Sequence, residues 1–209
     1  MTNPDTESRG RYCQVGSTPT AVFDGLNIKT GGGSTAQAAM VFNDYKQRIE
    51  PRMAKPPAAA FSNLQAKVEG QTVTVSGQVD LKPEGAANSE NVRLRIALVQ
   101  EVIRYSGSNG VRLHNFVVRK LMGTPEGKPL EKPGTKTSFF KTVNIGTLGE
   151  NQKEYLAKYE AETAGKRRPG FKFPEKPDRI DPAGLLIVAF LQDDQTKEIL
   201  QACFVKPGR

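Results

Sequence analysis

The chain has 209 residues, of which 37% are hydrophobic and 25% are charged. These values fit a soluble protein with a modest core, built as one large domain or two small ones. Two cysteines and one histidine make a poor ligand set, so we expect no metal site and no cofactor. No apolar stretch approaches the roughly 20 residues of a membrane helix, and residues 1–30 lack the apolar core of a secretory signal. A histidine-poor chain of this kind is not expected to be a self-sufficient enzyme.

The formal net charge is +8, and the densest basic segment begins after residue 165. Pro169 lies within this segment, which contains no recognisable nucleic-acid motif. We favour a solvated loop and keep a basic binding module for polyanions, nucleic acid or an anionic surface, as the alternative. The residues that would carry that alternative are Lys166, Arg167, Arg168 and Lys172.

The first elements are a helix and a β-hairpin. Asn3 can cap a helix that begins at Pro4 and ends near Tyr12 or Cys13. The apolar run 21–23 predicts a short strand, and the Asp-Gly pair after it is a strong turn signal. The chain is therefore expected to return as a second strand over 26–29.

A second helix is expected after the three glycines 31–33. Ser34 can cap it, and its apolar positions follow helical spacing until it ends before Pro51. Three prolines lie within 51–57, which predicts an extended linker there. We therefore divide the chain into residues 1–50, the linker 51–57 and residues 58–209.

The last part of the chain reads mainly as strands. Residues 64–79 alternate apolar and polar side chains around a Glu-Gly turn, as a half-buried hairpin does. One helix is expected over 150–164, and a closing hairpin turns at Asp193-Asp194. The remaining strands are expected within 92–105, 113–122, 139–145, 185–190 and 199–205. This pattern predicts an antiparallel β-sandwich with one helical insertion over 58–209.

The order of the first elements resembles the second half of a thioredoxin fold. Helix, Thr-Pro, strand, Asp-Gly hairpin and helix follow one another over residues 3–50, with Thr18-Pro19 at the place of the family's cis-proline. The resemblance implies a cis peptide bond at Pro19. It also implies that an extended peptide would pair with the backbone at Thr18, Pro19 and Thr20.

The later segments resemble bacterial thioredoxin-like proteins with a β-rich C-terminal extension of the outer-membrane-associated Omp type. The segments that carry this resemblance are 92–105, 107–110, 113–119 and 188–202. The resemblance implies a parent protein of the bacterial cell envelope or periplasm that acts in thiol–disulfide exchange. The family's Cys-x-x-Cys motif does not occur in this sequence. We therefore expect a non-catalytic C-terminal portion of such a protein, serving in scaffolding or protein interaction.

The predicted fold class is thus α+β: a partial thioredoxin-like module followed by a β-sandwich. A truncated sheet should leave an unpaired edge near residues 21–23. We expect a protein or peptide partner there, either the missing N-terminal half or a second copy in a homodimer.

The remaining reactive side chains have structural explanations. Cys13 has no resolving partner, so we expect an incidental thiol, with a lone redox thiol as an alternative enzyme hypothesis. Cys203 is expected in the core, and a bridge to Cys13 stays open. His114 is expected to be hydrogen-bonded, and Asp193-Asp194 to form a turn rather than a calcium site.

Overall fold

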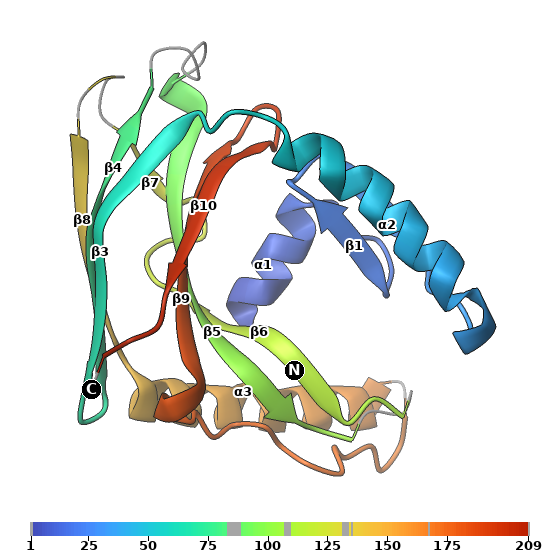
Figure 1. Cartoon of the computed structure of the whole chain (residues 1–209). Helices are drawn as coiled ribbons and strands as arrows, with labels where there is room; N and C mark the ends of the chain where they lie inside the picture. The colour runs from blue at the N-terminus through green and yellow to red at the C-terminus, as the bar shows by residue number, and fades with distance from the viewer. Residues whose placement is uncertain are drawn as a thin grey trace.

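The computed structural model describes residues 2–82, 89–106, 110–130, 134, 136–166 and 168–208. Two antiparallel sheets face each other and form a β-sandwich, with helices outside it (Figure 1). The larger sheet has the strand order β10-β9-β5-β6, and a short strand β7 also pairs with β5. The smaller sheet has the order β3-β4-β8. This arrangement confirms the predicted α+β class with a β-sandwich.

All the predicted strands of the sandwich are present, but β3 begins at Ala59 and β8 at Lys136, before the predicted starts at residues 64 and 139. The larger sheet consists of β5 (Val92–Arg104), β6 (Leu113–Leu121), β7 (Lys128–Pro129), β9 (Leu185–Asp193) and β10 (Ile199–Val205). The smaller sheet consists of β3 (Ala59–Glu69), β4 (Thr72–Leu81) and β8 (Lys136–Asn144). The predicted hairpins β3–β4 and β9–β10 are both present. The sequence did not signal β7, which is only two residues long.

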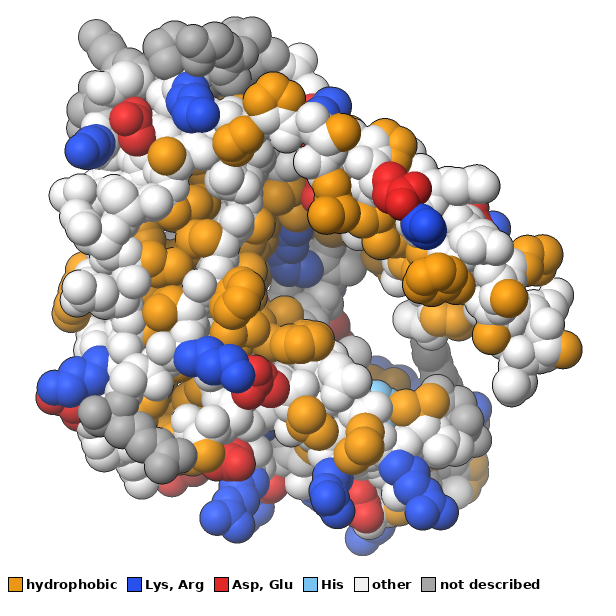
Figure 2. Space-filling view, in the orientation of Figure 1, with side chains coloured by type: hydrophobic (Ala, Val, Ile, Leu, Met, Phe, Trp, Pro, Cys, Tyr) orange, Lys and Arg blue, Asp and Glu red, His pale blue; other side chains and the backbone are white. Residues whose placement is uncertain are grey.

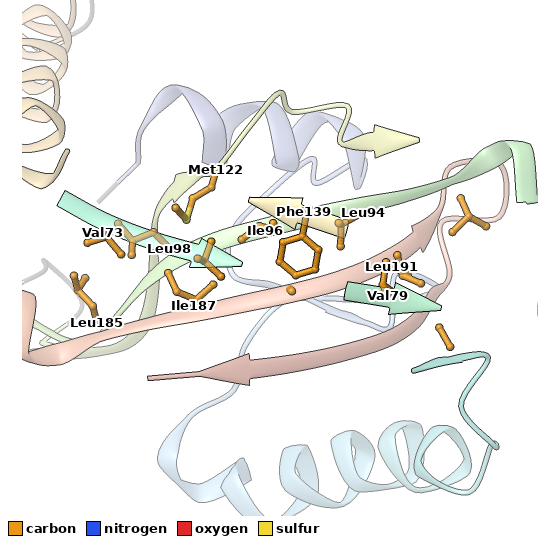
Figure 3. Close-up of a cluster of buried hydrophobic side chains, with 14 of the residues drawn as sticks. Val73, Val79, Leu94, Ile96, Leu98, Met122, Phe139, Leu185, Ile187 and Leu191 are labelled. Atoms are coloured by element: carbon orange, nitrogen blue, oxygen red, sulfur yellow. The ribbon is translucent and has the colours of Figure 1, made fainter. Parts of the chain in front are cut away.

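The core lies between the two sheets. In β4 every second side chain is buried, and these side chains meet those of β5 and β9 (Figure 3). Leu98 and Ile187 have no exposed surface. Such burial is worth roughly 1.5–3 kcal/mol for each large aliphatic side chain, so the sandwich holds most of the apolar stabilisation.

The N-terminal elements are α1 (Pro4–Tyr12), β1 (Thr20–Phe23), β2 (Asn27–Thr30) and α2 (Ala38–Met53). Asn3 caps α1 in a reciprocal capping box with Thr6, which confirms the predicted start. The β1–β2 hairpin turns at Asp24-Gly25, where both residues have positive φ. A short 3₁₀ turn, Thr35–Gln37, precedes α2.

Helix α1 is held against the edge strand β6. The Asn3 side-chain amide donates to the carbonyl oxygens of Val118 and Arg119, at 3.2 and 3.3 Å. The Asp5 carboxylate accepts from the Leu121 backbone N–H at 2.7 Å and pairs with Lys120 at 3.1 Å. Side chains of α1 therefore satisfy backbone groups that the last strand of the sheet would leave unpaired.

Two helix boundaries differ from the prediction. Helix α2 continues through Pro51 to Met53, because a proline in the last turn removes only one N–H from the ladder. The connector to β3 therefore begins later than residue 51, while the domain division itself stays a prediction. Helix α3 spans Ile145–Lys166 and begins before residue 150, since Asn144 accepts a hydrogen bond from the Thr147 N–H.

Helix α3 is the longest helix, with 22 residues, and polar side chains cover much of it. Among the described residues, no helix has both the length and the apolar character of a membrane span.

Candidate interaction site

The hairpin and α2 form a small unit outside the sandwich. Phe23 of β1 packs edge-on against Tyr45 of α2, with ring centroids 5.0 Å apart. The β1–β2 sheet has two strands only, so among the described residues one edge of each strand has no strand partner. A sheet of two strands is marginally stable by itself and depends on packing.

An apolar stripe runs along one face of α2. Phe42, Ile49 and Met53 are spaced i, i+7 and i+11, so they lie on one face of the helix. Their exposed fractions are 66%, 40% and 79%. We call these three residues the α2 stripe; hydrophobic side chains along α2 are visible in Figure 2. No residue of α2 is buried, so this helix presents apolar surface to solvent.

Charges on α2 neutralise one another. Arg48 pairs with Asp44 at 3.0 Å, and Lys46 pairs with Glu50 at 3.5 Å. Both pairs have helical i,i+4 spacing, so each cation sits beside its anion on the helix surface. The α2 surface therefore carries little net charge along its length.

The unit is anchored to the sandwich at the β9–β10 turn. Arg52 of α2 bonds to Asp24 at 2.9 Å and also to Glu198, and the Asp24 carbonyl accepts from the Ile199 N–H. Hydrogen bonds to Glu198 and Asp24 raise the pKa of Arg52. Burial disfavours the ionised form of Glu198, but the hydrogen bonds from Arg52 and Lys55 outweigh burial and lower its pKa.

Gly25 is needed at this anchor. It has φ +77°, and a Cβ at this position would lie 1.8 Å from the carbonyl oxygen of Lys197. A side chain here would meet both backbone strain and a backbone clash. The anchor therefore holds two turns in close contact, which the Asp-Gly signal alone did not indicate.

The predicted peptide-pairing residues lie at the start of β1. The Thr18–Pro19 bond is cis, the isomer that the resemblance implied. Thr18 and Pro19 are exposed, and the Thr20 hydroxyl donates to the Ser17 carbonyl at 2.6 Å. The Pro19 carbonyl accepts from the Gly31 N–H, so it already has a partner within the chain. Peptide pairing at Thr18, Pro19 and Thr20 stays a prediction.

Both cysteines are free thiols, so no bridge joins them in this structure. Cys13 caps the end of α1, where its backbone N–H donates to the Arg9 carbonyl oxygen at 2.9 Å. Cys203 packs against the core from β10, as predicted. Burial raises the pKa of Cys203 to about 11, so the reactive thiolate is scarce there at neutral pH.

His114 and the two aspartates have structural partners. The Nε2 atom of His114 lies 3.1 Å from the Tyr105 carbonyl oxygen. Asp193 accepts from the backbone N–H groups of Gln195 and Thr196, which is the predicted turn role. Among the residues that the structure describes, no three His, Cys, Asp or Glu side chains gather as a metal site would require.

A charged cluster between α1 and the larger sheet was not foreseen. Asp194 accepts from the Tyr12 hydroxyl and from Arg95, both at 2.7 Å, while Lys197 lies 4.0 Å from the centre of the Tyr12 ring. Burial and the hydrogen bond to Asp194 raise the pKa of Tyr12. The one available signal was Arg95, a buried arginine in the central strand β5.

The basic segment lies at the end of α3 and in the loop after it. Lys166, Arg168 and Lys172 are exposed, and Arg167 falls outside the described residues. The loop packs on α3 through aromatic rings, with Tyr159 and Phe173 centroids 5.6 Å apart. Lys176 pairs with Glu160 at 2.6 Å. Among the described residues, these contacts do not gather the basic side chains into one binding site, so polyanion binding stays the alternative prediction.

The fold is therefore an antiparallel β-sandwich that carries a helix–hairpin–helix unit at its N-terminal side. No family model matches the sequence, and no curated protein matches it. HBP35 of Porphyromonas gingivalis has a similar structure, with a TM-score of 0.62 and 12% identity over 97% of this chain and 57% of that chain. At this identity the likeness shows the fold alone.

The HBP35 alignment includes nearly the whole chain, so the N-terminal unit and the sandwich occur together in that protein. This chain spans 57% of the length of HBP35. A domain of the outer membrane lipoprotein Omp28 from Porphyromonas gingivalis gives a TM-score of 0.43 at 14% identity, over 74% of this chain and 91% of that one. This second likeness is too distant to support an argument.

Proposed function

We propose that this chain is a non-catalytic interaction and scaffolding region of a thioredoxin-like protein of the bacterial cell envelope. The sandwich is the scaffold, and the α2 stripe with the free edge of β1 is the contact surface. The observation that carries the proposal is the exposure of Phe42, Ile49 and Met53 on a helix that buries no residue. Apolar surface gathered on one helix face in this way marks an interaction site.

The occupant that this surface fits is a second copy of the chain. An apolar stripe is complementary to itself, as a two-fold dimer interface requires. The paired charges of α2 remove the like-charge repulsion that two copies would otherwise meet. The free edge of β1 can pair with its counterpart in antiparallel fashion, which would extend the two-stranded sheet.

The relation to thioredoxin-like proteins rests on the element order over residues 3–50 and on the resemblance of the later segments. The likeness to HBP35 supports the combination of both parts in one chain. The envelope location is supported by the sequence resemblance alone. A non-catalytic role agrees with the raised pKa of Cys203 and with Cys13 as a lone thiol at a helix end.

Light scattering across a wide range of protein concentration tests self-association. We expect the wild-type chain to reach the mass of a dimer as concentration rises, and the double variant Phe42→Ser/Ile49→Ser to stay monomeric. Phe140→Ser is the matched control, because Phe140 of β8 has the same exposed fraction, 66%, on a different surface. It should dimerise like the wild type.

A wild-type chain that stays monomeric at its highest attainable concentration would overturn the second-copy assignment. The α2 stripe would then be a surface for a different unit, such as the predicted missing half. A dimer that loses its stability equally in Phe140→Ser would also contradict the assignment, because the contact would lie elsewhere.

An insulin-reduction assay tests the non-catalytic part of the proposal. We expect no acceleration above the rate with dithiothreitol alone, and the same rate for Cys13→Ser. A wild-type rate well above background that disappears in Cys13→Ser would replace the proposal with the lone-thiol enzyme hypothesis.

A further inference from the structure

A cavity of about 270 Å³ opens at the edge of the sandwich, away from the α2 stripe. It lies between β5 and the segment that connects β6 to β7. Its apolar walls come from Leu94, Ile96, Met122 and Phe139, all of which belong to the core (Figure 3). The volume is just below the usual range for drug-sized ligands, so a small ligand fits it.

A lysine faces the inside of the sandwich at this cavity. Along β8 the more buried positions are Thr137, Phe139, Lys141 and Val143, so Lys141 occupies an inward position of the strand. It lines the cavity, and a Cβ at Gly123 would lie 3.7 Å from its Nζ atom. Among the described residues, its ammonium group has no hydrogen-bond or ion-pair partner. Lys141 therefore places a cation without a described protein partner beside apolar walls, an arrangement that suits an amphipathic anion.

The charged residues that line the cavity are all cationic. Arg95, Lys128 and Lys141 line it, and none of its described lining residues is an aspartate or a glutamate. Lys128 uses its ammonium group to donate to the Ser138 carbonyl at 3.0 Å, and Arg95 pairs with Asp194. Arg95 reaches Asp194 and Tyr12 on the face of β5 opposite the core, so Lys141 is the cation that can meet a ligand inside the sandwich.

We propose that this cavity binds a small amphipathic carboxylate, namely a medium-chain fatty acid. The alkyl chain lies against Ile96, Met122 and Phe139, and the carboxylate accepts hydrogen bonds from the Lys141 ammonium group. Lys128 adds positive potential at the same opening. The competing explanation is that Lys141 is an inward charge on the edge strand β8, which would only discourage pairing with other chains.

Isothermal titration calorimetry with decanoate, below the concentration at which it forms micelles, tests the proposal. We expect binding of one decanoate per chain, with decanol binding about tenfold more weakly because it lacks the charge. Lys141→Gln should weaken decanoate binding by a similar factor. Lys136→Gln is the matched control, because Lys136 lies on the same strand but at an exposed position on its other face.

A second variant separates ligand recognition from structure. Lys141→Met keeps the length of the side chain and removes its charge, so it should remove the preference for decanoate over decanol while the apolar walls still bind both. Circular dichroism should show the same fold for all variants. The double variant Phe42→Ser/Ile49→Ser should bind decanoate as the wild type does, which makes this test independent of the interaction surface.

Three results would overturn the proposal: no heat of binding for decanoate, equal affinity for decanoate and decanol, or unchanged decanoate affinity in Lys141→Gln. Each would leave Lys141 as an edge-protecting charge. Decanoate binding that Lys136→Gln reduces equally would place the site elsewhere and contradict the proposal as well.

Discussion

The sandwich and the N-terminal hairpin with α2 follow the same local rules but reach different degrees of burial. In the sandwich, β4 and β9 bury most of their inward side chains completely. In the hairpin and α2, no residue is buried, although the apolar run of β1 and the helical spacing of apolar residues in α2 are both present. The difference shows that sequence patterns specify elements, while burial needs enough neighbouring elements to close a core. The hairpin and α2 have the sequence patterns of a strand and a helix, but too few elements pack against them to bury their side chains.

The largest expected effect separates the two regions directly. Leu98→Ala removes a fully buried side chain from the central strand and should lower the free energy of unfolding by about 3–5 kcal/mol. Phe42→Ala on α2 should change it by less than about 0.5 kcal/mol, since Phe42 is exposed. Chemical denaturation of dilute, monomeric protein measures both. A large loss for Phe42→Ala would mean that the contrast in burial is wrong.

A smaller effect concerns the anchor between the regions. Gly25→Ala should cost about 1–3 kcal/mol, because the new Cβ meets the Lys197 carbonyl at a positive φ. Gly31→Ala is the control, since Gly31 also has positive φ but no atom within 4 Å of a built Cβ, and it should cost about 1 kcal/mol. Hydrogen exchange should show faster exchange of β1 and β2 amides in Gly25→Ala only. Equal exchange in both variants would count against the anchor.

The smallest expected effect is a dependence of the anchor on pH. The pKa of Glu198 is lowered in the folded protein, so its contribution is present above the ordinary value of 4.5 and is lost as the pH falls through the lower folded value. Its partial exposure limits this contribution to about 1 kcal/mol. Unfolding of Glu198→Gln should therefore depend less on pH between neutral and acidic solution. An identical pH profile for the wild type and Glu198→Gln would remove this interaction from the anchor.

The elements of the fold were largely predictable from the sequence, because their signals are local. Asn3 and Pro4 mark the start of α1, the Asp-Gly pair marks the first hairpin, and alternation marks β3 and β4. Pro51 was misleading because its effect depends on its position within the last turn of α2. These successes and this error come from interactions between residues close in the sequence.

The parts that were missed depend on residues far apart in the sequence. The cluster of Tyr12, Arg95 and Asp194 joins three distant segments, and no local pattern reports it. The inward position of Lys141 follows from the register of β8, which the run Phe139-Phe140 does not fix by itself. Peptide pairing at residues 18–20 stays a prediction, and Thr20 is the first residue of β1. The exposed stripe on α2 became visible only in the structure, because the sequence does not show which side chains of a helix stay uncovered.

The hydrogen bonds that Asn3 and Asp5 form with β6 cover part of the outer edge of the large sheet. A truncated protein that began after α1 would present the outer edge of β6 as a bare template of N–H and carbonyl groups, next to apolar neighbours. We expect such a protein to associate edge to edge more readily than the full chain. We therefore expect the first dozen residues to protect the large sheet from contact with sheets of other molecules.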